Sequence, residues 1–213
     1  YTRKIHLSSD NSFYLPLTNI PDVLVKLFIL AEDPHFYYHN GIHDYAIGLA
    51  IALNINYRKF KRGASTIPMQ LVRNLFLYQT KTVSRKLEEL LLAWLMINQF
   101  HIPKKRILEI YFNIIEFGEN VYGISEAANY YFDKQVRELN ISEYLVLSYI
   151  IPRPKYFLEA VQMKSPQLIK NLTFHMETYS KILLEGKVIN EDMIKNINFT
   201  INFRSSIGKL KLK

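Results

Sequence analysis

The stretch Ala31-Glu32-Asp33-Pro34-His35-Phe36-Tyr37-Tyr38-His39-Asn40-Gly41 decides how the rest of the chain is interpreted. It follows an apolar run, Val23 to Leu30, that predicts a helix. Glu32 and Asp33 then fall at the carboxyl end of that helix, where the helix dipole disfavours negative charge. On the rim of an apolar pocket the pKa of a carboxyl group rises toward neutrality, which suits a general base. This stretch alone leaves two interpretations open, a solvated helix end and a catalytic carboxylate.

The composition indicates a folded domain that binds anionic partners. The chain has 213 residues, of which 49% are hydrophobic and 22% charged, so a sizeable core is available. The aromatic share is 14%, almost all Tyr and Phe, side chains that suit carbohydrate faces and membrane interfaces. The net charge of +8 favours phosphate groups or anionic lipid, and no nucleic-acid motif accompanies it. With no Cys, a thiolate metal site and a cysteine nucleophile are excluded.

The sequence contains no segment that predicts a membrane span. A span needs roughly 18–20 apolar residues, whereas the longest apolar run is Leu90 to Ile97. The chain begins at Tyr1 without Met or a signal peptide. We therefore expect an excised domain whose membrane anchor lies upstream.

The hydrophobic periodicity, helix caps and proline positions predict a mainly helical protein forming one domain over residues 1–213, without internal repeats or linkers. A turn is expected between Gly118 and Gly123, and Pro152 and Pro154 are expected to end a helix. Residues 199–213 alternate weakly and could form a strand. Helices are expected at about 18–31, 43–56, 68–76, 83–100, 104–113, 124–132, 140–151 and 166–186, with a short one after 190.

One helix concentrates charge on a single face. Arg85 and Glu89 are spaced i,i+4 and Lys86 and Glu89 i,i+3, so the three can share a face. This spacing favours an ion-paired face in solvent, and the alternative is a functional cluster. The opposite face is apolar and carries Leu90, Leu91, Trp94 and Leu95.

Four motifs follow one another along the chain. They are Glu32-Asp33-x-x-Phe36-x-x-His39-x-Gly41, Gly63-Ala64-Ser65-Thr66-Ile67-Pro68-Met69-Gln70-Leu71-Val72-Arg73-Asn74, Arg85-Lys86-Leu87-Glu88-Glu89, and Lys104-Lys105-Arg106-Ile107-Leu108-Glu109-Ile110-Tyr111-Phe112-Asn113. In this order they resemble the motifs of glycosyltransferase family 51, the peptidoglycan transglycosylases, which also have counterparts of Gly118 to Gly123 and of the run Ala127 to Phe132. These enzymes occur alone or as the glycosyltransferase domain of class A penicillin-binding proteins.

The resemblance implies a lysozyme-like large lobe and a small membrane-facing jaw at about residues 42–62, with a cleft between them. It implies an inverting enzyme that polymerises a lipid II-like, polyprenyl-pyrophosphate-linked disaccharide. The implied location is the outer face of the bacterial cytoplasmic membrane, with the membrane surface and envelope-synthesis proteins as partners. An inverting transfer needs a base for the acceptor hydroxyl and positive charge for the departing pyrophosphate.

The resemblance also assigns roles to residues. Glu32 is expected to take the proton of the acceptor 4-hydroxyl. Glu89 is expected near the donor sugar or pyrophosphate, where a divalent cation (Mg²⁺ or Mn²⁺) could bind it. Packing is at least as good an explanation as ligand contact for His39 and Asn113. The substrate-binding set is Asp33, Phe36, His39, Ser65, Thr66, Gln70, Arg73, Lys81, Arg85, Lys86 and Asn113.

Several positions depart from the family pattern and keep alternatives open. Leu49 replaces an Arg, Ala64 a Gly, and Pro68-Met69 a polar pair, each of which removes polarity or charge. A polymerase of another lipid-linked saccharide, or an inactive saccharide-binding relative, would fit these changes. A lysozyme-like hydrolase is a further alternative, and it would need no cluster of basic residues.

Overall fold

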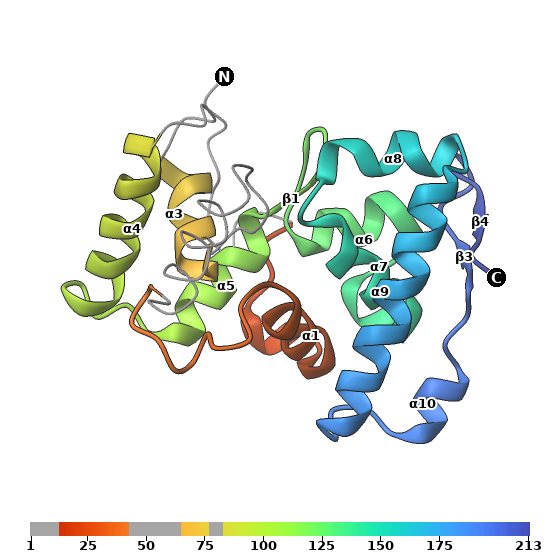
Figure 1. The fold of residues 1–213 in the computed structure, drawn as a ribbon, viewed down its shortest axis with the longest axis horizontal. Helices are drawn as coiled ribbons and strands as arrows, with labels where there is room; N and C mark the ends of the chain where they lie inside the picture. Colours follow the sequence, from red (N-terminus) through yellow and green to blue (C-terminus); the bar gives the residue numbers. More distant parts are fainter. Residues whose placement is uncertain (1–12, 43–64, 77–82) are drawn as a thin grey trace, which may run out of the picture. The chain divides into compact units, whose positions relative to one another are not determined.

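The computed structural model describes residues 13–42, 65–76 and 83–213 (Figure 1). The chain divides into two compact units. The larger unit contains the chain up to Ala31 together with Phe112–Lys213, and the smaller unit contains Glu32–Tyr111. In its described parts the protein is mainly helical, which confirms the predicted fold class.

The smaller unit is built on two helices packed against each other, α3 (Ile67–Phe76) and α4 (Val83–Asn98). The loop after α1 (Asp22–Glu32) and most of α5 (Lys104–Ile114) complete it. The first six residues of α3 are all buried, Gln70 among them. A buried polar side chain needs a hydrogen-bonding partner, so Gln70 is expected to have one within the protein.

The larger unit combines several helices with two short antiparallel hairpins. One hairpin joins β1 to β2, and the other joins β3 to β4. The bounds are η1 (Leu17–Asn19), β1 (Glu116–Gly118), β2 (Val121–Tyr122), α6 (Ile124–Phe132), η2 (Val136–Glu138), α7 (Ile141–Ile150), α8 (Pro154–Gln162), α9 (Pro166–Glu185), α10 (Glu191–Lys195), β3 (Thr200–Asn202) and β4 (Lys209–Lys211).

The core of the larger unit lies around α7, which is buried at every position except Tyr149. Its amino end is closed by a reciprocal capping pair. The Glu143 amide donates to Asn140 Oδ1 at 3.0 Å, and the Asn140 amide donates to Glu143 Oε2 at 2.8 Å. A helix that is buried on all sides has no exposed polar face, so the capping residues mark where it begins.

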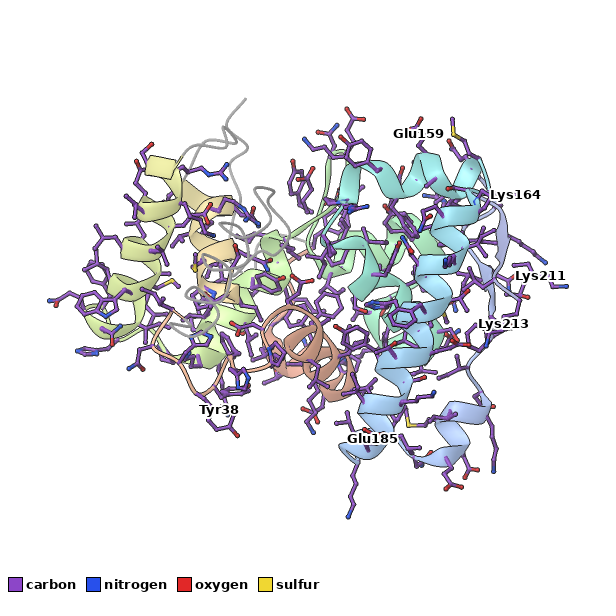
Figure 2. The ribbon with its side chains drawn as sticks, viewed as in Figure 1. Tyr38, Glu159, Lys164, Glu185, Lys211 and Lys213 are labelled. Carbon is purple, nitrogen blue, oxygen red and sulfur yellow. The ribbon has the colours of Figure 1, made fainter. Side chains whose placement is uncertain are left out.

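The carboxyl-terminal hairpin packs its aromatic side chain onto α6. Phe203 stacks on Phe132 with ring centroids 5.6 Å apart, and the Arg204 amide donates to the carbonyl of Tyr131 at 2.7 Å. Lys211 projects outward from β4 (Figure 2). The weak alternation of residues 199–213 therefore reflects a hairpin with one buried face.

Most of the predicted elements are present, and the differences are local. Gly118 ends β1 and Gly123 follows β2, so the turn predicted between them is part of a β-hairpin. Pro154 does more than end a helix, because it is the first residue of α8, an element that the sequence analysis missed. The helix predicted at 43–56 and the jaw predicted at 42–62 lie outside the described residues, except for Ile42. In the described parts of the chain no helix has the length and apolarity of a membrane span.

Candidate active site

Glu32 is the last residue of α1 and is half-buried. Pro34 follows two residues later, where its ring prevents the helix from continuing. Burial raises the pKa of the Glu32 carboxyl above its ordinary value. A hydrogen bond from Gln70 and the charge of Arg73 oppose this rise, and the charge of Asp33 adds to it. The direction is the one that the sequence analysis predicted for a carboxylate in a cleft.

A buried amide holds the Glu32 carboxylate. Gln70 Nε2 donates to Glu32 Oε2 at 2.8 Å, and the Tyr111 hydroxyl donates to Gln70 Oε1 at 3.1 Å. Gln70 is 6% exposed and Tyr111 is fully buried. Because an ionised carboxylate can only accept hydrogen bonds, an N–H donor at this distance favours the ionised form. Gln70, predicted to bind sugar, thus has both ends of its amide engaged within the protein.

The loop that follows Glu32 is fixed to α3 by a buried network. Asp33 accepts hydrogen bonds from the amide of Ile67 at 3.0 Å and from His39 Nε2 at 2.8 Å. The Gly41 amide donates to His39 Nδ1 at 3.1 Å, which assigns the proton of a neutral His39 to Nε2. Asp33 therefore satisfies the first amide of α3, and its polar atoms serve the fold.

Thr66 is the amino-terminal cap of α3 and a second link to the same loop. Its hydroxyl donates to the carbonyl of Gly41 at 2.7 Å and accepts from the Met69 amide at 3.3 Å. Pro68 sits at the second position of the helix, where its missing N–H costs no helical hydrogen bond. Pro68 and Met69, two of the departures from the family pattern, are therefore accommodated as buried residues of α3.

Lys104 at the start of α5 also binds the loop that follows Glu32. Its ammonium donates to the carbonyls of Phe36 and His39, both at 2.6 Å, and lies 4.6 Å from the centre of the Phe36 ring. Burial lowers the pKa of Lys104, and the charge of Asp33 opposes that shift. Phe36 is fully buried beneath it, whereas Tyr38 at the tip of the loop is 88% exposed and points outward (Figure 2).

The second group of predicted site residues gathers where α4 meets the start of α3. Lys86 Nζ donates to Ser65 Oγ at 2.7 Å and to Glu89 Oε2 at 2.8 Å. Arg85 Nε lies 3.3 Å from Glu89 Oε1. Glu89 is fully buried, although the Lys86 side chain keeps 39% of its surface exposed. A buried carboxylate with two cationic neighbours needs both of them to compensate its lost hydration.

The burial of Glu89 corrects the sequence-based preference for a solvent-exposed ion-paired face. In α4 the charged side packs inward, and the predicted apolar face is partly exposed. Leu91 and Trp94 of that face are 57% and 44% exposed. Spacing shows which residues share a helix face but not which face is buried. Here the apolar pattern led to the wrong prediction that the charged face is exposed.

The remaining predicted site residues are Asn113 and Lys81. Asn113 belongs to the larger unit, where its amide donates to the Leu15 carbonyl at 2.9 Å and its Oδ1 accepts from the Leu15 amide at 2.8 Å. This pair of hydrogen bonds fits the packing role that the sequence left open. Lys81 and the departures at Leu49 and Ala64 lie outside the described residues. Lys104 and Tyr111 belong to the fourth motif but were not among the predicted site residues; their i,i+7 spacing on one helix face was the available signal.

The predicted divalent cation finds little support in the donor set. Both oxygens of Glu89 face basic side chains. In the described ranges no group of three or more His, Cys, Asp or Glu side chains could hold a metal ion. A hard cation takes several oxygen ligands, which these residues do not supply.

A half-buried carboxylate with a raised pKa and a cluster of basic side chains around a second acid supply a base and positive charge, which are the groups that glycosyl transfer from a pyrophosphate donor requires. The chain belongs to the transglycosylase family, whose model matches residues 2–179. This membership confirms the resemblance found in the motifs and the prediction of a glycosyltransferase.

Curated relatives agree with this family. A biosynthetic peptidoglycan transglycosylase of Nitrosomonas eutropha is 41% identical over 151 residues, 71% of this chain and 60% of the relative. One of Acinetobacter baylyi is 34% identical over 163 residues, 76% of this chain and 72% of the relative. Penicillin-binding protein 1B of Haemophilus influenzae is 33% identical over 193 residues, 88% of this chain. The chain spans only 24% of the length of that last protein.

Proposed function

We propose that this protein polymerises a lipid-pyrophosphate-linked disaccharide into a peptidoglycan glycan strand, with Glu32 as the general base. The observation that carries the proposal is the Glu32 carboxylate, half-buried with a raised pKa and held at 2.8 Å by Gln70. A base with a pKa shifted toward neutrality is matched to proton abstraction from a sugar hydroxyl. The family and the names of its relatives support the reaction class.

The reaction is a single inverting displacement. Glu32 takes the proton of the acceptor 4-hydroxyl while that oxygen attacks the anomeric carbon of the donor sugar. The bond between that carbon and the pyrophosphate oxygen breaks, and the lipid pyrophosphate leaves with its negative charge. A base on the acceptor and positive charge on the leaving group are the two groups that this step requires.

Lys86 and Arg85 are the described residues best suited to the departing pyrophosphate. Lys86 donates to Ser65 and Glu89 but remains partly exposed, so the third N–H of its ammonium group can still donate to a ligand. Arg73 also lies close enough to Glu32 to lower its pKa, and in the family pattern its position carries Lys. Arg offers a planar fork for phosphate oxygens where Lys offers a point charge. The possible cation at Glu89 stays a prediction, and no step here uses one.

The proposed location is the outer face of the cytoplasmic membrane, where a polyprenyl-linked donor would be held. The excess of basic residues suits an anionic surface or a pyrophosphate group. A lysozyme-like hydrolase is disfavoured because it needs no cluster of basic residues, whereas Arg85 and Lys86 gather around Glu89.

Incubation of the purified protein with lipid-linked disaccharide in detergent tests the proposal. We expect polymer, measured by gel electrophoresis of a labelled substrate. Fragments released from preformed glycan would indicate the hydrolase instead, and binding without turnover would indicate an inactive saccharide-binding relative. Either of these results would refute the proposed function.

The role of the basic cluster has its own test. Lys86→Met should weaken binding of polyprenyl pyrophosphate, measured by isothermal titration calorimetry, by about ten-fold or more, since it removes one charge-assisted hydrogen bond. Lys195→Met is the matched control, because Lys195 forms a comparable i,i+3 pair with Asp192 on an exposed helix. Equal affinities of the two variants would remove Lys86 from the pyrophosphate site.

A further inference from the structure

Gln70 can face Glu32 in two ways, and the structure contains a group that selects one of them. The amide of a glutamine presents an acceptor oxygen on one side and a donor nitrogen on the other. Here the nitrogen faces Glu32 at 2.8 Å, and the oxygen accepts from the Tyr111 hydroxyl at 3.1 Å. Turning the amide over would place its oxygen against the carboxylate, which repels it when ionised.

Tyr111 is suited to act as a permanent donor. It is fully buried on α5, and burial raises its pKa well above the ordinary value. The negative charges of Glu32 and Asp33 add to this rise, and Arg73 opposes it. The hydroxyl therefore stays protonated throughout the pH range in which a carboxyl base titrates. Its proton remains available to the oxygen of Gln70.

Among the described residues, the charged groups that act on Glu32 or on the loop after it come from α3, from α5 and from that loop itself. Arg73 on α3 lowers the pKa of Glu32, and the adjacent Asp33 raises it. From α5, Lys104 binds the loop carbonyls and interacts with Asp33. None of these contacts orients the Gln70 amide, and within the described parts of the chain Tyr111 is the group bonded to its oxygen.

We propose that Tyr111 is a positioning residue for glycan transfer: through the buried amide of Gln70 it aims a hydrogen-bond donor at Glu32 and so keeps the base ionised and correctly directed. This inference rests on the proposed role of Glu32 as the base. It also gives Gln70 a task other than the sugar contact expected from its motif. Tyr111 itself does not touch the substrate.

The decisive experiment measures the titration of Glu32 and the reaction in the same variants. The Glu32 carboxyl is followed by NMR of protein labelled with carboxyl-¹³C glutamate, and its resonance is assigned by its loss in Glu32→Gln. We expect Tyr111→Phe and Gln70→Met to move the titration midpoint of Glu32 to higher pH. Each should lower kcat/KM about ten-fold on the acidic limb, the effect of one lost hydrogen bond to a charged group, with recovery at higher pH.

Combining the changes tests whether Tyr111 acts through Gln70. In a Gln70→Met background, Tyr111→Phe should have no further effect on the midpoint or on the acidic limb, because the group through which it acts is gone. An additive effect in the double variant would overturn the proposal. If Tyr111→Phe does not fold, an unmoved midpoint in Gln70→Met alone overturns it.

Tyr131→Phe is the matched control. Tyr131 is also a fully buried helical tyrosine, and its hydroxyl donates to the Phe117 carbonyl at 2.7 Å in the larger unit. We expect it to lower stability but to leave the Glu32 midpoint and the pH profile unchanged. If Glu32→Gln keeps full polymerase activity while Tyr111→Phe still moves the midpoint, the role of Glu32 as the base fails and the positioning contact stands. A midpoint unmoved in Tyr111→Phe refutes the positioning role itself.

Discussion

Gly41→Ala tests how the loop that follows Glu32 is held against α4. Gly41 has φ +94°, a conformation that L side chains rarely adopt. A Cβ at this position would lie 2.5 Å from the Ala93 carbonyl oxygen and 2.9 Å from its carbon. Because these are backbone atoms of a packed helix, they cannot move aside as a flexible side chain would. The loop itself would have to move.

The expected cost has two parts. Backbone strain at a positive φ contributes about 1–2 kcal/mol. Overpacking against α4 contributes about 1–3 kcal/mol more. We therefore expect Gly41→Ala to lower the free energy of unfolding by about 2–5 kcal/mol in total. Movement of the loop also strains the bonds that Gly41 makes with His39 and Thr66, so polymerase activity should fall as well.

Gly208→Ala is the control that separates strain from contact. Gly208 has φ +95°, but no atom lies within 4 Å of the position its Cβ would take, so this variant should show only the strain. Urea unfolding followed by far-UV circular dichroism gives both free energies. The fluorescence of Trp94, the single tryptophan of the chain, reports on the helix beside Gly41. If Gly41→Ala is no less stable than Gly208→Ala, the close packing of the loop on α4 is refuted.

Three further predictions concern stability. Thr66→Val removes the cap of α3 and the bond to Gly41, and should lower the free energy of unfolding in urea by about 1–3 kcal/mol; an unchanged midpoint would contradict the capping role. Glu32 binds its proton more tightly in the folded state, so wild type should lose stability relative to Glu32→Gln as pH rises from 4.5 through the raised pKa; parallel stability curves would argue against it. Burial lowers the pKa of His175 from 6.5 to about 4, so the unfolded chain binds that proton more tightly. Wild type should lose about 3 kcal/mol more than His175→Gln as pH falls through this range, and equal losses would contradict the buried neutral imidazole.

Local signals along the chain predicted the helices well. The cap at Asn140 and the largely apolar run behind it predict α7 with nearly correct bounds. Pro154 was misread because a proline ends one helix and begins another with equal ease, and only tertiary packing distinguishes the two. Helix caps and apolar runs depend on residues that are close together in the chain, so they can be recognised in a single sequence.

The site was predictable in its residues but not in its contacts. The motifs brought out Glu32 and Glu89, yet spacing on α4 favoured an exposed position for Glu89, which is fully buried. The role of Tyr111 is not visible in the sequence, because it depends on a hydrogen bond between residues 41 positions apart. The hydrogen-bonding partner of a polar side chain on an apolar helix face depends on how the helices pack, and a single sequence does not contain that information.

The most direct test of the account is the polymerisation rate of Glu32→Gln with lipid-linked disaccharide. This substitution keeps the size of the side chain and an acceptor for Gln70, but removes the basic oxygen. We predict a rate about 10²- to 10⁴-fold below wild type, with an unchanged circular dichroism spectrum. A folded Glu32→Gln variant that makes polymer within a few-fold of the wild-type rate would contradict the assignment of Glu32 as the base.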